Sequence, residues 1–156
     1  MNKNEFLGKK FDKNLVLDNI KNTFVSKSKI HGNGLFASKK IKTESLLCLL
    51  DGQYLKYDFL VKIQEFYKNK KHIDNNKSSN ISLEWNALTK DILLVRFYST
   101  KYGFINHSPV PNVKIVKNPL KLISIKDIEE GEELLLDYRE ESLNEEYLLN
   151  HGIKYL

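Results

Sequence analysis

The chain has 156 residues and a formal net charge of +5, and its length fits one domain with a sizeable core. Hydrophobic residues make up 41% and charged residues 29%, which excludes wholesale disorder, and no apolar run reaches the ~20 residues of a membrane helix. The single cysteine, Cys48, excludes an internal disulfide and a cysteine-cluster zinc site. No secretory signal is visible at the start, so we expect an intracellular protein with no membrane partner.

Charge is spread unevenly along the chain. Residues 1–42 carry ten lysines and three carboxylates, whereas residues 127–146 carry ten carboxylates and one arginine. Two interpretations stay open, because such runs are either solvated faces or, for the acidic run, a rim that attracts a cationic protein substrate. Arg96 and Arg139 are the only arginines. Arginine is the usual residue for base and phosphate contacts, so nucleic acid is an unlikely direct substrate.

The first half of the chain predicts short strands and one long helix. A polar lead-in with a short helix near 15–20 precedes strands at 23–26, at 35–37 after a glycine turn, and at 45–50. Apolar residues at helical spacing then predict an amphipathic helix over 56–69, and the polar residues 68–80 predict a loop.

The second half predicts more short strands. They are expected at 81–88, 92–98, 113–117, 120–125 and 133–136, followed by a last short helix at 142–150. There is no repeat and no long linker. The fold class is therefore α+β and mostly β.

Three segments carry candidate chemistry, although each has an ordinary structural explanation when taken alone. Gly32-Asn33-Gly34 is a tight turn that lets the backbone approach a ligand. The segment 106–112 (NHSPVPN) is a polar loop stiffened by two prolines. The segment 128–138 (IEEGEELLLDY) is a glycine turn feeding an apolar strand that ends in Asp-Tyr.

Together, these three segments resemble the SET-domain protein lysine methyltransferases in content, order and spacing. The resemblance covers residues 23–138 and implies a fold of small twisted sheets with a C-terminal pseudoknot, in which the segment at 106–112 and the segment before Tyr138 pass through one another. It implies a lead-in at 1–22, a SET domain at 23–138 with an inserted helix and loop at about 53–80, and a closing C-terminal segment at 139–156.

The resemblance also implies a cofactor, S-adenosyl-L-methionine, and the residues that bind it. The backbone of His31, Gly32, Asn33 and Gly34 would hold the methionine end. Asn106 and His107 would contact the methionine and adenine parts. Tyr138 would be the catalytic residue and would also border the cofactor. No metal is implied.

The substrate implied is a lysine in a protein. The strand near Ser82, Leu83 and Trp85 would contact the peptide, and for Trp85 a place in the core or in the cleft wall stays open as the alternative. The positions that tune the number of methyl groups are Ile115 and Leu136, and because neither carries a hydroxyl we favour di- or trimethylation. Histones, histone-like DNA-binding proteins and ribosomal proteins are all open as substrates, and the oligomeric state is open too.

Two positions depart from the family's sequence pattern and leave alternative functions open. Leu50 stands where the family often has a channel tyrosine, with Tyr54 nearby as a substitute, and Gly103 stands where the family often has arginine. They leave room for a catalytically silent SET-fold module that binds a cofactor or partner. A third hypothesis is a small basic nucleic-acid binder that uses residues 1–42, which the scarcity of arginine disfavours.

Overall fold

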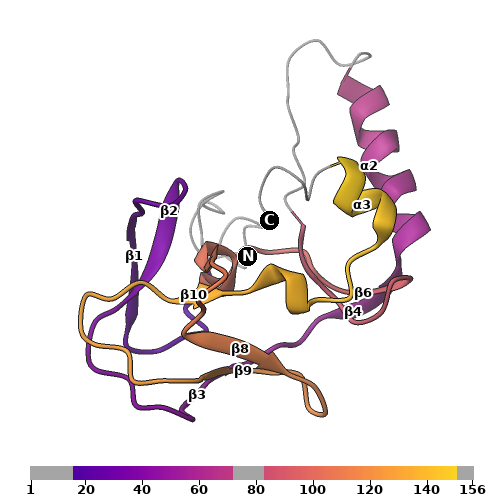
Figure 1. Cartoon of the computed structure of the whole chain (residues 1–156). Coiled ribbons are helices and arrows are strands. Elements are labelled where there is room, and N and C mark those ends of the chain that lie inside the picture. Colours follow the sequence, from indigo (N-terminus) through magenta and orange to yellow (C-terminus); the bar gives the residue numbers. More distant parts are fainter. Residues whose placement is uncertain (1–15, 72–82, 151–156) are drawn as a thin grey trace, which may run out of the picture.

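The computed structural model describes residues 16–71 and 83–150. Ten short strands in this part form three small sheets (Figure 1). The mostly β class predicted from the sequence is confirmed. In chain order the strands are β1 (Thr23–Lys27), β2 (Asn33–Ala37), β3 (Leu46–Leu49), β4 (Gln53–Lys56), β5 (Glu84–Ala87), β6 (Ile92–Arg96), β7 (Asn106–His107), β8 (Val113–Val116), β9 (Lys121–Ser124) and β10 (Leu135–Leu136). The helices are α2 (Tyr57–Lys71) and α3 (Glu145–Asn150), with 3-10 turns η1 (Lys101–Phe104) and η2 (Tyr138–Glu140).

The C-terminal strand β10 threads between two strands that are close in sequence. The five-stranded sheet has the order β3-β9-β8-β10-β7, and β10 pairs in parallel with both β7 and β8. The 108–112 connection between β7 and β8 therefore has to pass around β10. Its ends are tied to that strand, because the Ser108 amide donates to the Leu136 carbonyl and the Asn112 amide donates to the Leu135 carbonyl, both at 3.0 Å. This threading is an exception to the usual rule for chain connections, and it is the pseudoknot expected from the sequence.

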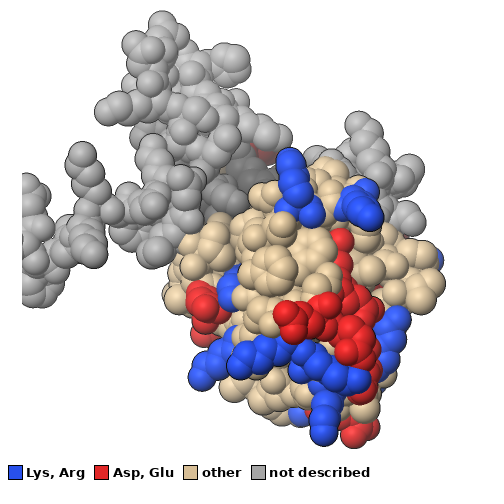
Figure 2. All heavy atoms as spheres, turned by 90° about the vertical axis from the view of Figure 1, so that its left-hand side faces the viewer, with Lys and Arg blue, Asp and Glu red and all other residues tan. Residues whose placement is uncertain are grey.

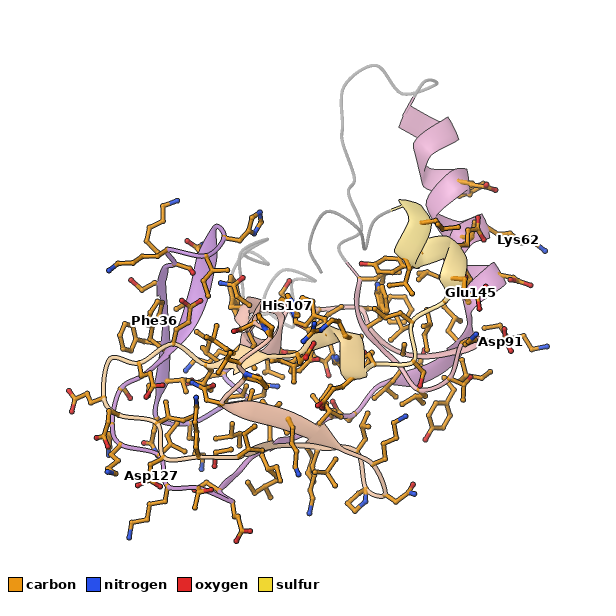
Figure 3. All side chains as sticks on the ribbon, in the orientation of Figure 1. Phe36, Lys62, Asp91, His107, Asp127 and Glu145 are labelled. Carbon is orange, nitrogen blue, oxygen red and sulfur yellow. The ribbon has the colours of Figure 1, made fainter. Side chains whose placement is uncertain are left out.

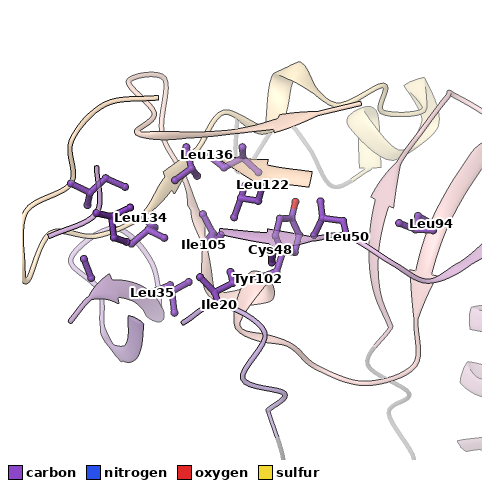
Figure 4. Packing of buried hydrophobic residues seen from close by; sticks show 14 residues of the cluster. Ile20, Leu35, Cys48, Leu50, Leu94, Tyr102, Ile105, Leu122, Leu134 and Leu136 are labelled. Atoms are coloured by element: carbon purple, nitrogen blue, oxygen red, sulfur yellow. The ribbon is translucent and has the colours of Figure 1, made fainter. Parts of the chain in front are cut away.

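One hydrophobic core lies between the β1–β2 hairpin and the five-stranded sheet (Figure 4). Its fully buried members include Ile20, Leu35, Leu122 and Leu134. Leu134 and Leu136 both point into this core, because side chains two residues apart in extended chain lie on the same face. Cys48 is buried in the same cluster, as its apolar strand predicted.

A second cluster joins α2 to the three-stranded sheet β4-β6-β5. Tyr57 and Leu60 of α2 are three residues apart, so they lie on one helix face and pack against Leu93 and Val95 of β6. Tyr147 of α3 packs against this cluster too, so the segment after the pseudoknot closes over the sheet. Phe66 also belongs to the helical spacing of apolar residues in 56–69, but it is 61% exposed.

Several expected elements need correction. The prediction of a short helix near 15–20 is wrong for the described residues 16–20. Leu17 instead forms a parallel bridge with Thr100. The stretch 53–56, expected within the inserted helix and loop, is strand β4, because its backbone pairs with β6. The strand expected at 133–136 shortens to β10, and η1 was not anticipated. The expected loop at 68–80 begins later, since α2 runs to Lys71, and residues 72–82 lie outside the described part.

Candidate active site

Three segments that are far apart in sequence meet at the pseudoknot. They are the glycine turn before β2, the β7 pair Asn106–His107, and the end of β10 leading to Tyr138. His107 lies near the centre of the molecule, between the β1–β2 hairpin and the side formed by α2 and α3 (Figure 3). The parallel pairing of Leu136 with His107 brings Asp137 and Tyr138 against the NHS segment.

The amide of Asn106 is held in one orientation by three acceptors. Its Nδ2 donates to the carboxylate of Glu133 at 2.7 Å and lies 3.2 Å and 3.3 Å from the carbonyl oxygens of His31 and Asn33. Because Nδ2 faces these acceptors, Oδ1 points away from them and is left to accept from another donor. His31, Asn33 and Asn106, all predicted to bind the cofactor, therefore lie together in a group rich in hydrogen-bond acceptors.

Glu133 joins this group because Gly34 has no side chain. Its Oε2 accepts from the Ser28 hydroxyl at 3.0 Å, and its Oε1 is the oxygen that faces Asn106. A Cβ built on Gly34 would lie 2.1 Å from Oε1, so any other residue would displace the carboxylate. Gly32 serves the turn differently, because its φ of 51° is in the left-handed region.

His107 orients the backbone at Tyr138. The Tyr138 N–H donates to Nδ1 of His107 at 3.1 Å, so Nδ1 is unprotonated and the ring carries its proton on Nε2. The Asp137 carboxylate lies 3.8 Å from the same Nδ1, but it is engaged by Arg139, with Oδ2 at 2.6 Å from Nη2. That guanidinium lowers the pKa of Asp137 to about 2.

The Tyr138 side chain is held by its hydroxyl group and by the contact of its ring with His107. Its hydroxyl donates to the buried carbonyl of Ile105, and its ring centroid lies 5.3 Å from that of His107. Burial, helped by the nearby charge of Glu141, raises the pKa of the phenol to about 12. The hydroxyl is therefore protonated at neutral pH, and what it offers to the site is the pair of lone pairs on its oxygen.

A cavity of about 50 Å³ borders this end of β10. Both positions expected to tune the methylation state, Ile115 and Leu136, line it together with Leu120 and Glu141. The structure thus unites two residues that are 21 positions apart in sequence, which the pairing of β8 with β10 explains.

The other expected substrate residues are more scattered. Tyr54 is 77% exposed and lines a second, larger cavity. Lys117 and Leu120 line both cavities, which makes the two neighbours. Trp85 packs edge-on against Tyr147, with ring centroids 5.0 Å apart, and Leu83 packs against the same cluster. Ser82 lies outside the described residues.

The two departures from the family pattern have structural consequences. Leu50, at the position where the family often has a channel tyrosine, is buried in the main core (Figure 4) and lines the larger cavity. Gly103 makes room for Glu84, since a Cβ there would lie 2.8 Å from its carboxylate. Glu84 in turn pairs with the buried guanidinium of Arg96 at 2.7 Å.

Sequence reasoning missed Glu133 and Glu141. Both belong to the acidic run 127–146, where charge alone suggested solvated faces or a rim. The signal for Glu133 was its place next to Leu134, whose inward direction turns Glu133 to the opposite side of the backbone. Glu141 carried no local signal, because its partners come from Asn86, Ala87 and Tyr102.

The acidic run is partly neutralised and partly turned inward. Figure 2 shows lysine or arginine and carboxylate side chains in adjoining bands over one face. Lys40 lies 3.3 Å from Asp127 and 2.5 Å from Glu129, while Glu132 and Glu133 hydrogen-bond to side chains of the pseudoknot. These contacts favour the interpretation as a solvated, ion-paired face over that of an acidic rim.

Comparison with known families agrees with this geometry. The SET-domain model matches residues 32–139, well over half of the chain, and the chain therefore belongs to the SET-domain family. Members of this family are typically protein lysine methyltransferases. A comparison with curated proteins gives no match. In the described part of the chain, no helix combines the length and apolarity that crossing a membrane requires.

Proposed function

We propose that the protein transfers a methyl group from S-adenosyl-L-methionine to the side-chain amine of a lysine in a protein substrate. The observation that supports this most is the meeting of Asn106, His107 and Tyr138 with the glycine turn through the threading of β10. In the reaction the lysine nitrogen attacks the methyl carbon, the carbon–sulfur bond breaks with its electrons on sulfur, and the amine's proton leaves to solvent.

The acceptor-rich place around Asn106 fits the methionine end of this cofactor. An α-ammonium group needs acceptors and negative charge, and the carbonyls of His31 and Asn33 and the carboxylate of Glu133 are of that kind. When bound, the cofactor supplies a methyl group made electrophilic by sulfonium. Gly32 and Gly34 would hold its methionine end through their backbone, and His107 would border its adenine.

Tyr138 would act at the point of transfer. Because its hydroxyl hydrogen is committed to Ile105, its oxygen can accept weak C–H···O contacts from the polarised methyl group. A tyrosine with a pKa of about 12 is not the base that deprotonates lysine. Desolvation in the cavity lowers the lysine pKa instead, and alignment of the reacting atoms supplies much of the rate.

The walls of the cavity would set how many methyl groups are added. Ile115 and Leu136 present alkyl groups, so neither restrains the amine with a hydroxyl, and we propose di- or trimethylation. Leu83, Trp85 and Ser82 would contact the peptide, and Tyr54 would contact it from the neighbouring cavity. Histone, histone-like and ribosomal proteins are the substrate classes to screen.

The deciding experiment is calorimetric binding of S-adenosylmethionine to the full chain. We expect saturable one-site binding that is weakened in Asn106→Ala and unchanged in Lys114→Ala, an exposed control on β8. A screen of lysine-rich proteins with methyl-labelled cofactor then measures transfer. Cofactor binding without transfer to any of them would favour the silent module, and absence of binding would contradict the proposal.

A further inference from the structure

Glu141 is a partly buried carboxylate whose hydrogen-bond partners among the described residues are all neutral. Its Oε2 accepts from the Ala87 amide at 2.8 Å, and its Oε1 accepts from the Tyr102 hydroxyl at 3.2 Å and from Nδ2 of Asn86 at 3.3 Å. Within the described residues, no lysine or arginine nitrogen lies within 4.0 Å of it. Buried carboxylates are normally paired with a cation.

Two cations of the described residues approach Glu141, and both are occupied elsewhere. Arg96 approaches Glu141 through Asn86 and through Tyr102, over whose ring its guanidinium lies at 5.4 Å, and its own charge is matched by Glu84 at 2.7 Å. Lys117 shares the cavity wall, but its Nζ lies near the Leu88 carbonyl and the Ser142 hydroxyl, at 3.4 Å and 3.5 Å. The negative charge of Glu141 is therefore not cancelled by either residue.

The lining of the cavity beside Glu141 suits an alkyl chain that ends in a positive charge. Ile115, Leu120 and Leu136 supply apolar wall. Three acidic residues also line it: Glu140, Glu141 and Asp137, which is engaged by Arg139. The cavity's volume of about 50 Å³ is several times the ~10–15 Å³ that one water needs by the same measure. Burial raises the pKa of Glu141 above its usual range, so a cation entering the cavity would relieve a real desolvation cost.

We propose that Glu141 binds the ammonium group of the substrate lysine before it loses its proton, and the methylated ammonium afterwards. This inference rests on the proposed function, because it places the lysine channel at this cavity. The carboxylate stabilises the charged amine, so Glu141 increases the affinity for substrate and opposes proton loss. It positions the amine, and desolvation in the cavity together with the cofactor's positive charge then outweighs the carboxylate and favours deprotonation.

The test uses n-butylammonium as a probe and n-butanol as its uncharged match. Binding to the full chain is followed by NMR, with and without S-adenosylhomocysteine. We expect n-butylammonium to bind at least about tenfold more tightly than n-butanol, since a charge-assisted hydrogen bond contributes at least that factor. Glu141→Gln should abolish the preference, and Glu130→Gln, which changes an exposed carboxylate outside the lining of the cavity, should keep it.

Cross-peaks between the probe's methylene protons and the methyl groups of Ile115 and Leu136 give a second measurement on the wild-type chain, which needs no variant to fold. A wild-type chain without preference for the cation, or a preference that survives in folded Glu141→Gln, would overturn the proposal. Failure of S-adenosylhomocysteine to bind would contradict the proposed function instead, because the probe titration without it measures the cavity separately.

Discussion

Replacing Arg96 by methionine should destabilise the protein strongly, because it removes the cation of a buried polar network. The Arg96 side chain is 2% exposed and its partner Glu84 is 11% exposed. Nη1 and Nη2 also donate to the Asp51 carbonyl at 2.9 Å and to Asn86 Oδ1 at 2.5 Å. The variant would leave a buried carboxylate and two acceptors without their donor, which costs about 3–5 kcal/mol of unfolding free energy.

Urea denaturation followed by circular dichroism measures this cost. The matched control is Lys40→Met, which removes a cation from an ion pair whose side chains are 49% and 64% exposed, so its effect on the urea midpoint should be small. The double variant Glu84→Gln with Arg96→Met should recover much of the loss, since glutamine carries no charge yet still accepts from the Thr100 amide.

The reasoning would be refuted if Arg96→Met unfolded at the same urea concentration as Lys40→Met. It would also be refuted if the double variant were less stable than Arg96→Met alone, because the loss would then not come from the stranded charge of Glu84.

Four further outcomes are expected. Tyr138→Phe should cut methyl transfer by at least about tenfold while costing about 1–3 kcal/mol of stability through the lost bond to Ile105, as measured by a labelled-methyl assay and by urea denaturation. Glu133→Gln should weaken S-adenosylhomocysteine binding about tenfold or more in calorimetry and leave 5′-methylthioadenosine, which lacks the amino-acid part, unaffected. Asp137, whose folded-state pKa of about 2 lies below the unfolded value of about 3.9, should contribute stability that is present above about pH 4 and lost as the pH falls toward 2; Arg139→Gln should flatten that dependence. Cys48, with its thiol pKa raised by burial to about 11, should react with a disulfide reagent slowly in the native chain and rapidly in urea.

A specific result would contradict each of these four predictions. Full transfer by Tyr138→Phe would remove Tyr138 from the site. Equal weakening of both ligands by Glu133→Gln would mean a general loss of fold. An acid dependence identical in wild type and Arg139→Gln would show that this guanidinium does not set the titration of Asp137. Rapid native labelling of Cys48 would contradict its burial.

The strands were predictable where hydrophobicity and turns coincide in sequence. Strands β2, β8 and β9 lie close to their expected ranges because each combines strand-forming residues with a glycine or proline nearby. The segment at 53–56 follows Gly52 directly and borders an obvious helical pattern. It forms β4 because it pairs with β6, whose partner residues lie at least 36 positions further along the chain. The helix expected near 15–20 failed for the same reason, since Leu17 is held by a bridge to Thr100.

The cofactor residues were foreseeable to different extents. Asn106, His107 and Tyr138 stand in motifs of the right order, and the threading of β10 brings them together. Glu133 stands in the same motif, but its function follows only from the space left by Gly34. The substrate positions divide likewise, because Ile115 and Leu136 share a cavity whereas Tyr54 belongs to its neighbour.

The amino-acid sequence by itself determined the size of the core, the mostly β class, the order of the three motifs and the burial of Cys48, because composition and local periodicity suffice for these. Only the tertiary structure decided the partners of charged groups. Glu133, Glu141 and Lys40 all lie in or face charge-rich stretches, yet one reaches Asn106, one faces a cavity and one forms surface ion pairs. A carboxylate's neighbours are chosen by chain segments far away in sequence, and its energy depends on whether they exclude water.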